Sequence, residues 1–149
     1  MKIALGSDHG GYELKELIKN HLEEKGIEYV DCGTNSTESV DYPEFGRKVA
    51  ETVKEGTCEL GIVCCGTGIG ISISANKVPG IRCALCSDCY SARMSKEHNN
   101  ANVLALGARV LGRDLAMEIV DTWIESEFQG GRHERRVNKI SDIENKFVI

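Results

Sequence analysis

Residues 59–70 carry side chains whose types and spacing suit chemistry that develops negative charge on oxygen. An apolar run ends at Cys65, and three glycines at alternate positions follow it, with the hydroxyl of Thr67 between the first two. Glycines let backbone N–H groups turn toward a ligand, and a helix starting near Ile69 would add its positive dipole end. The same dipole favours thiolate over thiol. The segment therefore offers a base or nucleophile beside an anion cradle.

This glycine loop does not follow two common phosphate-binding patterns. The Gly-Lys-Ser/Thr ending of a Walker A loop is absent, and Gly70 comes one position too early for the dinucleotide pattern G-x-G-x-x-G. A tight strand-to-helix turn without a ligand is the simpler alternative. Because three glycines in five residues cost chain entropy, we favour a functional loop.

A second polar cluster follows the first apolar run, where Asp8 and His9 stand directly before Gly10 and Gly11. A carboxylate and an imidazole in a glycine-rich turn could face a ligand. Alternatively, Asp8 caps the following helix and His9 is merely exposed.

The segment His98-Asn99-Asn100 places an imidazole beside two amides, a combination that could bind sugar hydroxyls. A lone histidine is more often structural or superficial, and these residues by themselves leave the two alternatives equally open.

A basic segment near the C-terminus follows Gly130-Gly131. Arg132 and Arg136 are four residues apart, so on a helix they share a face, and two guanidinium groups match a phosphate dianion. Arg135 would point elsewhere. A solvated basic helix explains the charge pattern equally well.

Seven cysteines without a signal peptide indicate reduced thiols, most of them packed as small apolar groups. Cys86 and Cys89 have C-x-x-C spacing, which keeps a thiol redox or zinc module as an alternative, although no second pair of zinc ligands is evident.

Short apolar strands alternate with helical patterns along the whole chain. This order predicts the α/β class, as a three-layer αβα Rossmann-like domain with a five-stranded parallel sheet. The predicted strands cover residues 2–7, 27–32, 59–65, 81–86 and 103–107. The predicted helices cover residues 12–25, 43–55, 69–77, 88–97 and 113–128, with a short helix after the basic segment.

Ligands of such sheets bind beyond the carboxyl ends of the strands. We therefore expect Asp8, Cys65 and Arg109 at one edge. His98 precedes the last strand, so the topology puts it at the opposite edge, from which it could still serve the site of a neighbouring subunit.

The composition limits the classes of partner. A chain of 149 residues forms one domain, and its net charge of −5 argues against nucleic acid. No apolar run reaches the ~18 residues that a membrane span needs, and the first residues lack the long apolar core of a signal peptide. We expect a cytoplasmic protein.

The chain resembles ribose-5-phosphate isomerase type B, a family that also contains galactose-6-phosphate isomerase subunits. The segments that carry the resemblance are residues 6–11, 39–43, 65–70, 98–99, 102–107 and 130–133 together with Arg136. They run through essentially the whole chain in order.

The resemblance implies an isomerase that interconverts ribose 5-phosphate and ribulose 5-phosphate through a cis-enediolate, in the pentose phosphate pathway. It implies no metal and no cofactor. It also implies a homodimer with shared sites, or a dimer of dimers, in which residues 132–149 pack on the partner. The alternatives are an isomerase of allose or galactose 6-phosphate, and a non-catalytic module that binds phosphosugar or nucleotide.

The resemblance also implies roles for individual residues. Cys65 would be the base that moves a proton between C2 and C1. Gly66, Gly68, Ile69 and Gly70 would stabilise the enediolate, while Thr67 and Asp8 would handle sugar hydroxyls. His98 would assist ring opening, with Asn99 beside it. The phosphate would be held by His9, Arg109, Arg132 and Arg136, some of them from the partner subunit.

Two departures from the family pattern matter. Many members have Asp where Asn100 stands, so Asn100 receives no role. Some members use a glutamate shortly after the glycine loop as the base, but residues 71–74 carry no carboxylate, which leaves Cys65 as the candidate.

Overall fold

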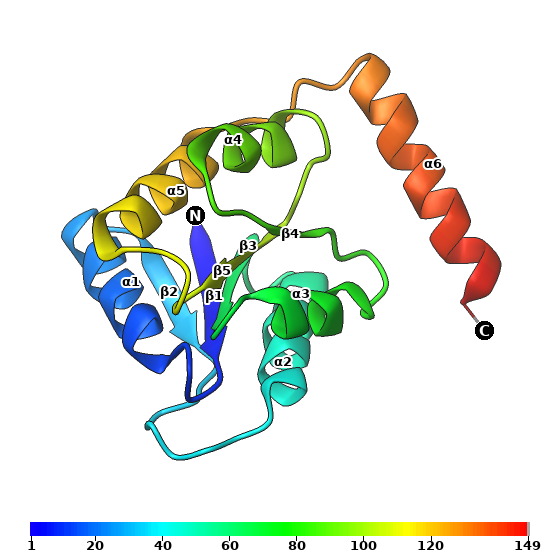
Figure 1. Ribbon diagram of the computed structural model, residues 1–149. Coiled ribbons are helices and arrows are strands. Elements are labelled where there is room, and N and C mark those ends of the chain that lie inside the picture. The colour runs from blue at the N-terminus through cyan, green and yellow to red at the C-terminus, as the bar shows by residue number, and fades with distance from the viewer. Residues whose placement is uncertain (149) are drawn as a thin grey trace.

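The structure, a computed structural model, describes residues 1–148. They form a five-stranded parallel sheet and six helices (Figure 1). The strands are β1 (Lys2–Ser7), β2 (Glu28–Asp31), β3 (Leu60–Cys65), β4 (Cys83–Leu85) and β5 (Val103–Gly107). The helices are α1 (Tyr12–Glu24), α2 (Tyr42–Lys54), α3 (Ile69–Asn76), α4 (Cys89–Glu97), α5 (Arg113–Glu125) and α6 (Arg132–Phe147).

Helices cover both faces of the sheet, which confirms the predicted three-layer α/β architecture (Figure 1). On one face α1, α4 and α5 bury a core that includes Ile18 and Trp123. On the other face α2 and α3 bury a core that includes Val49 and Ile71. Since successive side chains of a strand point to opposite faces, the neighbours Cys64 and Cys65 belong to different cores.

The strand order is β2-β1-β3-β5-β4, and every pairing is parallel. After β1 the chain turns to α1 on one face, whereas after β3 it turns to α3 on the other. The loops that leave these two adjacent strands therefore diverge, and a crevice opens between them at the carboxyl edge, as is usual where the winding of an α/β sheet reverses.

Local sequence explains the elements around this crevice. All six residues of β3 are buried, which fits a central parallel strand covered on both sides. Pro43 stands in the first turn of α2, where its missing N–H costs nothing. The Asp88 side chain caps α4 by accepting a hydrogen bond from the Ser91 N–H at 2.7 Å.

The fourth strand is shorter than the prediction of residues 81–86. It is an edge strand that pairs only with β5. At its start, backbone N–H groups bond to side chains instead of to a neighbouring strand: the Arg82 N–H donates to Oδ1 of Asn102, and the Cys83 N–H donates to Oδ1 of Asn76.

The two C-terminal helices also differ from the predictions. Helix α5 ends at Glu125 rather than at Phe128, because Ser126 is extended and the Gln129 N–H donates to the carbonyl of Glu97. Helix α6 is not short: it runs for 16 residues, over which Val137, Ile140, Glu144 and Phe147 recur at helical spacing.

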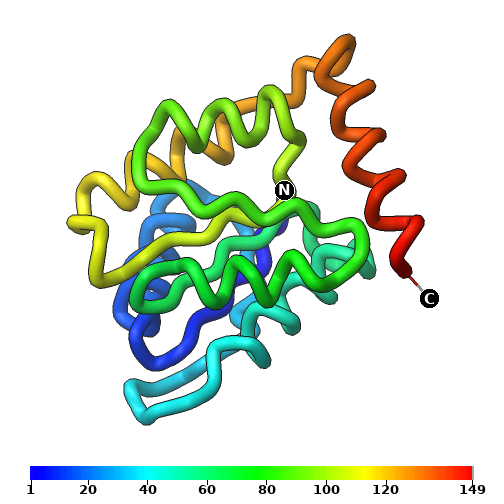
Figure 2. The backbone as a smooth tube through the Cα atoms, turned by 45° about the vertical axis from the view of Figure 1, so that its right-hand side comes forward, coloured from blue at the N-terminus to red at the C-terminus, as the bar shows by residue number. Residues whose placement is uncertain are grey.

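Helix α6 stands apart from the sheet and its covering layers (Figures 1 and 2). Ile149, the last residue of the segment expected to meet a partner, lies outside the described residues. No helix within residues 1–148 combines the length and apolar character needed to cross a membrane.

Candidate active site

A cavity of about 500 Å³ opens at the carboxyl edge, between the loops that follow β1 and β3. Its lining residues are Asp8, Tyr42, Cys65, Gly66, Thr67, Ile69, Gly70, Ile73 and Arg109. The predicted site residues that follow three different strands therefore line one cavity, as expected for the carboxyl edge of a parallel sheet.

The Cys65 thiol lies at the end of β3 and is 5% exposed. The Gly68 N–H donates to its Sγ at 3.1 Å. This contact places a hydrogen-bond donor and the start of α3 beside a sulfur that lines the cavity. A hydrogen-bonded sulfur at the edge of a cavity is placed to exchange a proton with a bound molecule.

Cys64 lies in a different environment. It is buried in the core beneath α1, and burial raises the pKa of its thiol well above the ordinary value. Of the two neighbouring thiols, only Cys65 lines the cavity.

The glycine loop turns from β3 into α3 around Gly68, which has a φ of 79° and is the N-cap of the helix. The Ile69 N–H donates to the Thr67 hydroxyl at 3.2 Å. The N–H groups of Gly68 and Ile69 thus point at two side chains that line the cavity, the Cys65 thiol and the Thr67 hydroxyl.

Close backbone contacts fix the loops next to the cavity. A Cβ at Gly107 would lie 2.5 Å from the carbonyl oxygen of Thr67, and one at Gly11 would lie 2.3 Å from the carbonyl oxygen of Cys64. A Cβ at Gly68 would lie 2.8 Å from the carbonyl carbon of Leu106. Only glycine fits at these three positions, because backbone meets backbone there.

Asp8 is buried at the crevice, where its Oδ1 accepts a hydrogen bond from the Gly11 N–H at 3.0 Å. Its own N–H donates to the carbonyl of Cys64 at 3.3 Å. The N-cap of α1 is Gly11, without a side-chain cap, so Asp8 closes the turn after β1 instead of capping the helix.

His9 is oriented by the loop between β2 and α2. Its Nδ1 accepts a hydrogen bond from the Val40 N–H at 3.2 Å. Nδ1 is therefore unprotonated, and Nε2 is the ring nitrogen that can donate to an anion.

Arg109 brings a cation to the glycine loop. Its backbone N–H donates to the carbonyl of Gly66 at 2.9 Å, and a Cβ at Gly66 would lie 3.0 Å from Nη1 of its guanidinium. A Cβ at Gly10 would lie 3.4 Å from its Nη2. The guanidinium thus lies against the loops after β1 and β3, within reach of an anion in the cavity.

The remaining predicted site residues belong to the other edge of the sheet. His98 is the C-cap of α4, and its ring stacks on that of His133 from α6, with centroids 4.1 Å apart. Arg132 and Arg136 are exposed on α6. None of these side chains lines the cavity around Cys65 in the same chain.

Asn99, next to His98, is also absent from the cavity lining and is exposed beyond the end of α4. The topological expectation for His98 is thus met, and the single chain holds two separate groups of predicted site residues.

The sequence interpretation missed Tyr42, which lines the cavity from the first turn of α2. A Cβ at Gly70 would lie 2.5 Å from its ring. The sequence signal that could have found Tyr42 is Pro43, which marks the start of a helix. Because that helix begins at the carboxyl edge, the side chains of its first turn lie near the crevice.

Cys86 is buried and Cys89 is half-buried. Within the described part of the chain, no three His, Cys, Asp or Glu side chains come close enough together to hold a metal ion.

A parallel sheet with a glycine loop, a thiol and a cavity at its winding reversal defines an α/β protein with a small-molecule site beyond the carboxyl ends of its strands. The chain belongs to the Ribose/Galactose Isomerase family, whose model matches residues 3–140.

Two solved structures and one curated protein illustrate the relationship. Ribose-5-phosphate isomerase B of Escherichia coli is 51% identical over 97% of this chain and 97% of its own length. The Clostridium thermocellum ribose-5-phosphate isomerase B structure is 64% identical, with a TM-score of 0.98 over 99% of this chain and 100% of that chain. The Mycoplasma genitalium ribose-5-phosphate isomerase B structure with bound ribulose-5-phosphate is 41% identical, with a TM-score of 0.92 over 97% of this chain and 96% of that chain.

Proposed function

We propose that the protein is an aldose–ketose isomerase that interconverts ribose 5-phosphate and ribulose 5-phosphate. The observation that supports this most is the Cys65 thiol, which lines the cavity with the Gly68 N–H at 3.1 Å from its Sγ. The Escherichia coli relative and the Clostridium thermocellum structure carry the name of the same activity. A protein that only binds phosphosugar would have no need for such a base.

In the proposed reaction, the Cys65 thiolate removes the proton from C2 of the open-chain aldose and returns it to C1, while the hydroxyl proton of O2 passes to O1. Negative charge develops on oxygen in the enediolate, and N–H groups of residues 66–70 stabilise it. A positioned base contributes about 10²–10⁴ in rate, and a backbone donor about 10²–10³. The reaction is redox-neutral, so it requires no external oxidant or reductant.

Asp8 and Thr67 line the same cavity and would orient the sugar hydroxyls. His9 can donate through Nε2, and Arg109 presents its guanidinium beside Gly66, so both suit the phosphate. Binding a phosphate far from the reacting carbons positions the sugar and therefore affects rate as well as affinity.

We also propose a homodimer in which the second copy supplies the groups at the opposite edge: His98 for ring opening, with Asn99 beside it, and Arg132 with Arg136 for the phosphate. Helix α6 exposes Ile140, Ile143 and Phe147, the last of which is 74% exposed. An apolar row of this kind on a helix that stands apart fits packing against a partner subunit (Figure 2).

Mixing two impaired variants tests the shared site. Cys65→Ala removes the base and Arg136→Ala removes a phosphate ligand, so homodimers of either variant have two defective sites. In a mixed dimer of a shared-site enzyme, one site carries both changes and the other carries neither. Dissociation and reassociation of an equal mixture should then restore about a quarter of the wild-type activity at low substrate. Activity that stays at the average of the two variants would contradict a shared site.

The second candidate substrate is a hexose 6-phosphate, because the family description includes galactose. A coupled assay that compares ribose 5-phosphate with allose 6-phosphate and galactose 6-phosphate separates the two. The highest kcat/KM with ribose 5-phosphate supports our proposal, and preference for a hexose phosphate overturns it.

We further propose a cytoplasmic role in the pentose phosphate pathway, which is where ribose 5-phosphate and ribulose 5-phosphate interconvert. A dimer of dimers is an alternative assembly to the simple dimer, and sedimentation velocity of the purified protein distinguishes them.

A further inference from the structure

We infer that Asp31, which the buried Lys15 holds in place, is a positioning residue for the candidate active site. It holds the start of the loop at residues 33–41, whose far end orients His9 and leads into Tyr42. Its catalytic consequence rests on the proposed isomerase function, whereas its structural consequence can be measured independently.

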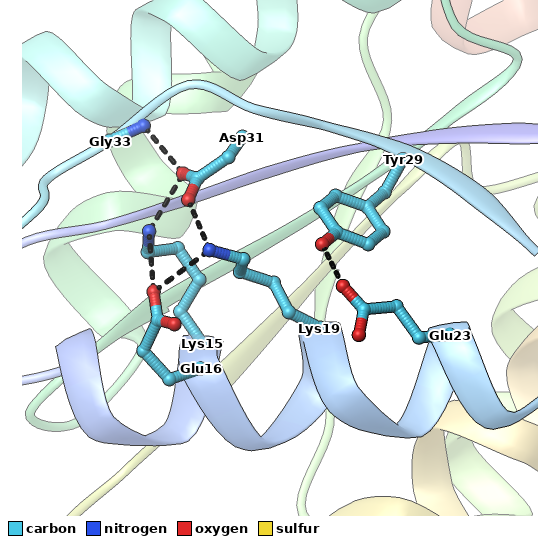
Figure 3. A network of polar contacts seen from close by, with 7 residues as sticks. All are labelled: Lys15, Glu16, Lys19, Glu23, Tyr29, Asp31 and Gly33. Atoms are coloured by element: carbon cyan, nitrogen blue, oxygen red, sulfur yellow. Dashed lines mark hydrogen bonds and ion pairs between the residues drawn. The ribbon is translucent and has the colours of Figure 1, made fainter.

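The pair lies between α1 and the end of β2 (Figure 3). Lys15 is 1% exposed, and its Nζ donates to Asp31 Oδ1 at 2.7 Å, while Lys19 donates to Oδ2 at 3.0 Å. Both ammonium groups also lie near Glu16, at 3.4 and 3.2 Å. Because a buried ammonium group is costly without a partner, Lys15 restricts the Asp31 carboxylate to one place.

The charges of this network stabilise one another. Burial by itself would raise the pKa of Asp31, but hydrogen bonds from Lys15, Gly33 and Lys19 outweigh it and hold the pKa below the ordinary value. The hydrogen bond to Asp31 in turn raises the pKa of Lys19. The carboxylate is therefore charged at neutral pH and remains a strong acceptor.

Asp31 also fixes the backbone of the loop that follows it. Its Oδ1 accepts a hydrogen bond from the Gly33 N–H at 2.9 Å (Figure 3). The Gly33 carbonyl accepts from the Ser7 N–H at 2.8 Å, and the Thr34 N–H donates to the Ser7 carbonyl at 2.8 Å. The start of the loop is thus hydrogen-bonded to both the N–H and the carbonyl of Ser7, the residue that precedes Asp8.

The far end of the loop reaches two groups of the site. The Val40 N–H donates to Nδ1 of His9, which leaves Nε2 as the donor nitrogen. Two residues later, Tyr42 lines the cavity and packs on Gly70 of the glycine loop. The loop that is held at Gly33 and Thr34 is therefore the segment that carries Val40 and Tyr42 to the site, and we expect release of its start to loosen both.

A neighbouring contact provides a matched control. The Tyr29 hydroxyl donates to Glu23, so it also joins β2 to α1 in the same view (Figure 3). Tyr29 lies two residues before Asp31, and its bond goes to α1 rather than to the loop backbone. Tyr29→Phe removes a link between these two elements while leaving the anchor of Gly33 in place.

The catalytic experiment compares Asp31→Ala with Asp31→Asn. Alanine removes the acceptor of the Gly33 N–H, and we expect KM for ribose 5-phosphate to rise roughly tenfold while kcat changes less than about threefold. Asparagine keeps an oxygen that can accept from Gly33 and Lys15, so it should restore KM to within about threefold of wild type. Tyr29→Phe should leave KM unchanged.

The structural experiment follows hydrogen exchange at the Thr34 and Val40 amides by NMR. We expect faster exchange at both in Asp31→Ala and wild-type rates in Asp31→Asn and Tyr29→Phe. If the lone alanine variant does not fold because Lys15 is left unpaired, the double variant Lys15→Met/Asp31→Ala removes that charge and still lacks the acceptor.

A folded Asp31→Ala or double variant with unchanged KM and protected Thr34 and Val40 amides would overturn the inference, even if its melting temperature fell, because that result describes a merely structural ion pair. If wild-type protein does not isomerise ribose 5-phosphate, the proposed function fails, and the exchange rates still decide whether Asp31 holds the loop.

Discussion

The two edges of the sheet hold their polar side chains in different ways. At the carboxyl edge, Cys65 and Asp8 are buried and are fixed by backbone hydrogen bonds from Gly68 and Gly11. At the opposite edge, Arg132 and Arg136 are exposed on a helix that stands apart from the sheet (Figure 1). The first group is organised within one chain, whereas the second is presented outward, as a group offered to another subunit would be.

The largest effect should come from the centre of the organised edge. We expect Cys65→Ala to lower kcat by about 10²–10⁴, because it removes the proposed base without disturbing the loop backbone. Cys64→Ala is the matched control: its thiol lies in the opposite core, so kcat should stay within about threefold and stability should fall by about 1 kcal/mol. Near-wild-type turnover of purified Cys65→Ala would contradict the assignment of the base to the carboxyl edge.

The next effect concerns the outward-facing edge. We expect Arg136→Ala to raise KM for ribose 5-phosphate by roughly ten- to a hundredfold, the loss typical of a hydrogen bond to a charged group. Arg135→Ala, one residue away on a different side of α6, should change KM little. Equal weakening of unphosphorylated ribose by Arg136→Ala would show that Arg136 does not act through the phosphate.

The opposite edge holds a histidine that should make the stability of the protein depend on pH. Burial of His133 lowers its pKa, and the adjacent ring of His98 lowers it further. A histidine whose pKa falls on folding binds fewer protons in the folded state, so its contribution to stability is present above about pH 6.5 and is lost as the pH falls through the lowered value. The midpoint of urea denaturation should therefore decrease from pH 7 to pH 5.

His133→Phe sharpens this prediction, because phenylalanine can keep the stack on His98 but cannot titrate. We expect its denaturation midpoint to depend less on pH than that of the wild type. The same slope in both proteins would assign the pH dependence to groups elsewhere.

The smallest effect on stability should come from the hydrogen bond that joins α6 to the rest of its own chain. Both carboxylate oxygens of Glu144 accept from the Gly80 N–H, at 3.1 and 3.0 Å. Because the contact is exposed, Glu144→Gln should cost less than about 1 kcal/mol of unfolding free energy. Asp142→Asn on the same helix is the control, and a large loss in Glu144→Gln would show that α6 is held chiefly by its own chain.

The carboxyl edge could be predicted largely from the sequence. Continuous apolar strands such as residues 60–65 require a covered parallel sheet, and that topology gathers the residues that follow each strand. The same rule placed His98 at the opposite edge. Residue roles beyond this placement came from the family resemblance and stay predictions.

Long-range contacts account for what the sequence did not indicate. Lys15 and Asp31 read as ordinary charged residues of a helix and a strand, and only the fold brings them to 2.7 Å. Tyr42 stands just before the helix predicted for residues 43–55 and received no role, although its ring packs on Gly70. The length of α6 was underestimated because its apolar positions are sparse among charged residues, and within one chain most of them remain exposed.

The contacts of main chain against main chain at Gly11, Gly68 and Gly107 set a limit on how this protein can be redesigned. Any substitution at these glycines must push whole loops apart, so the size of the pocket cannot be adjusted by changing them. Libraries that aim at longer or shorter sugars should instead vary the rim side chains of Tyr42, Ile69 and Ile73, whose atoms border the opening.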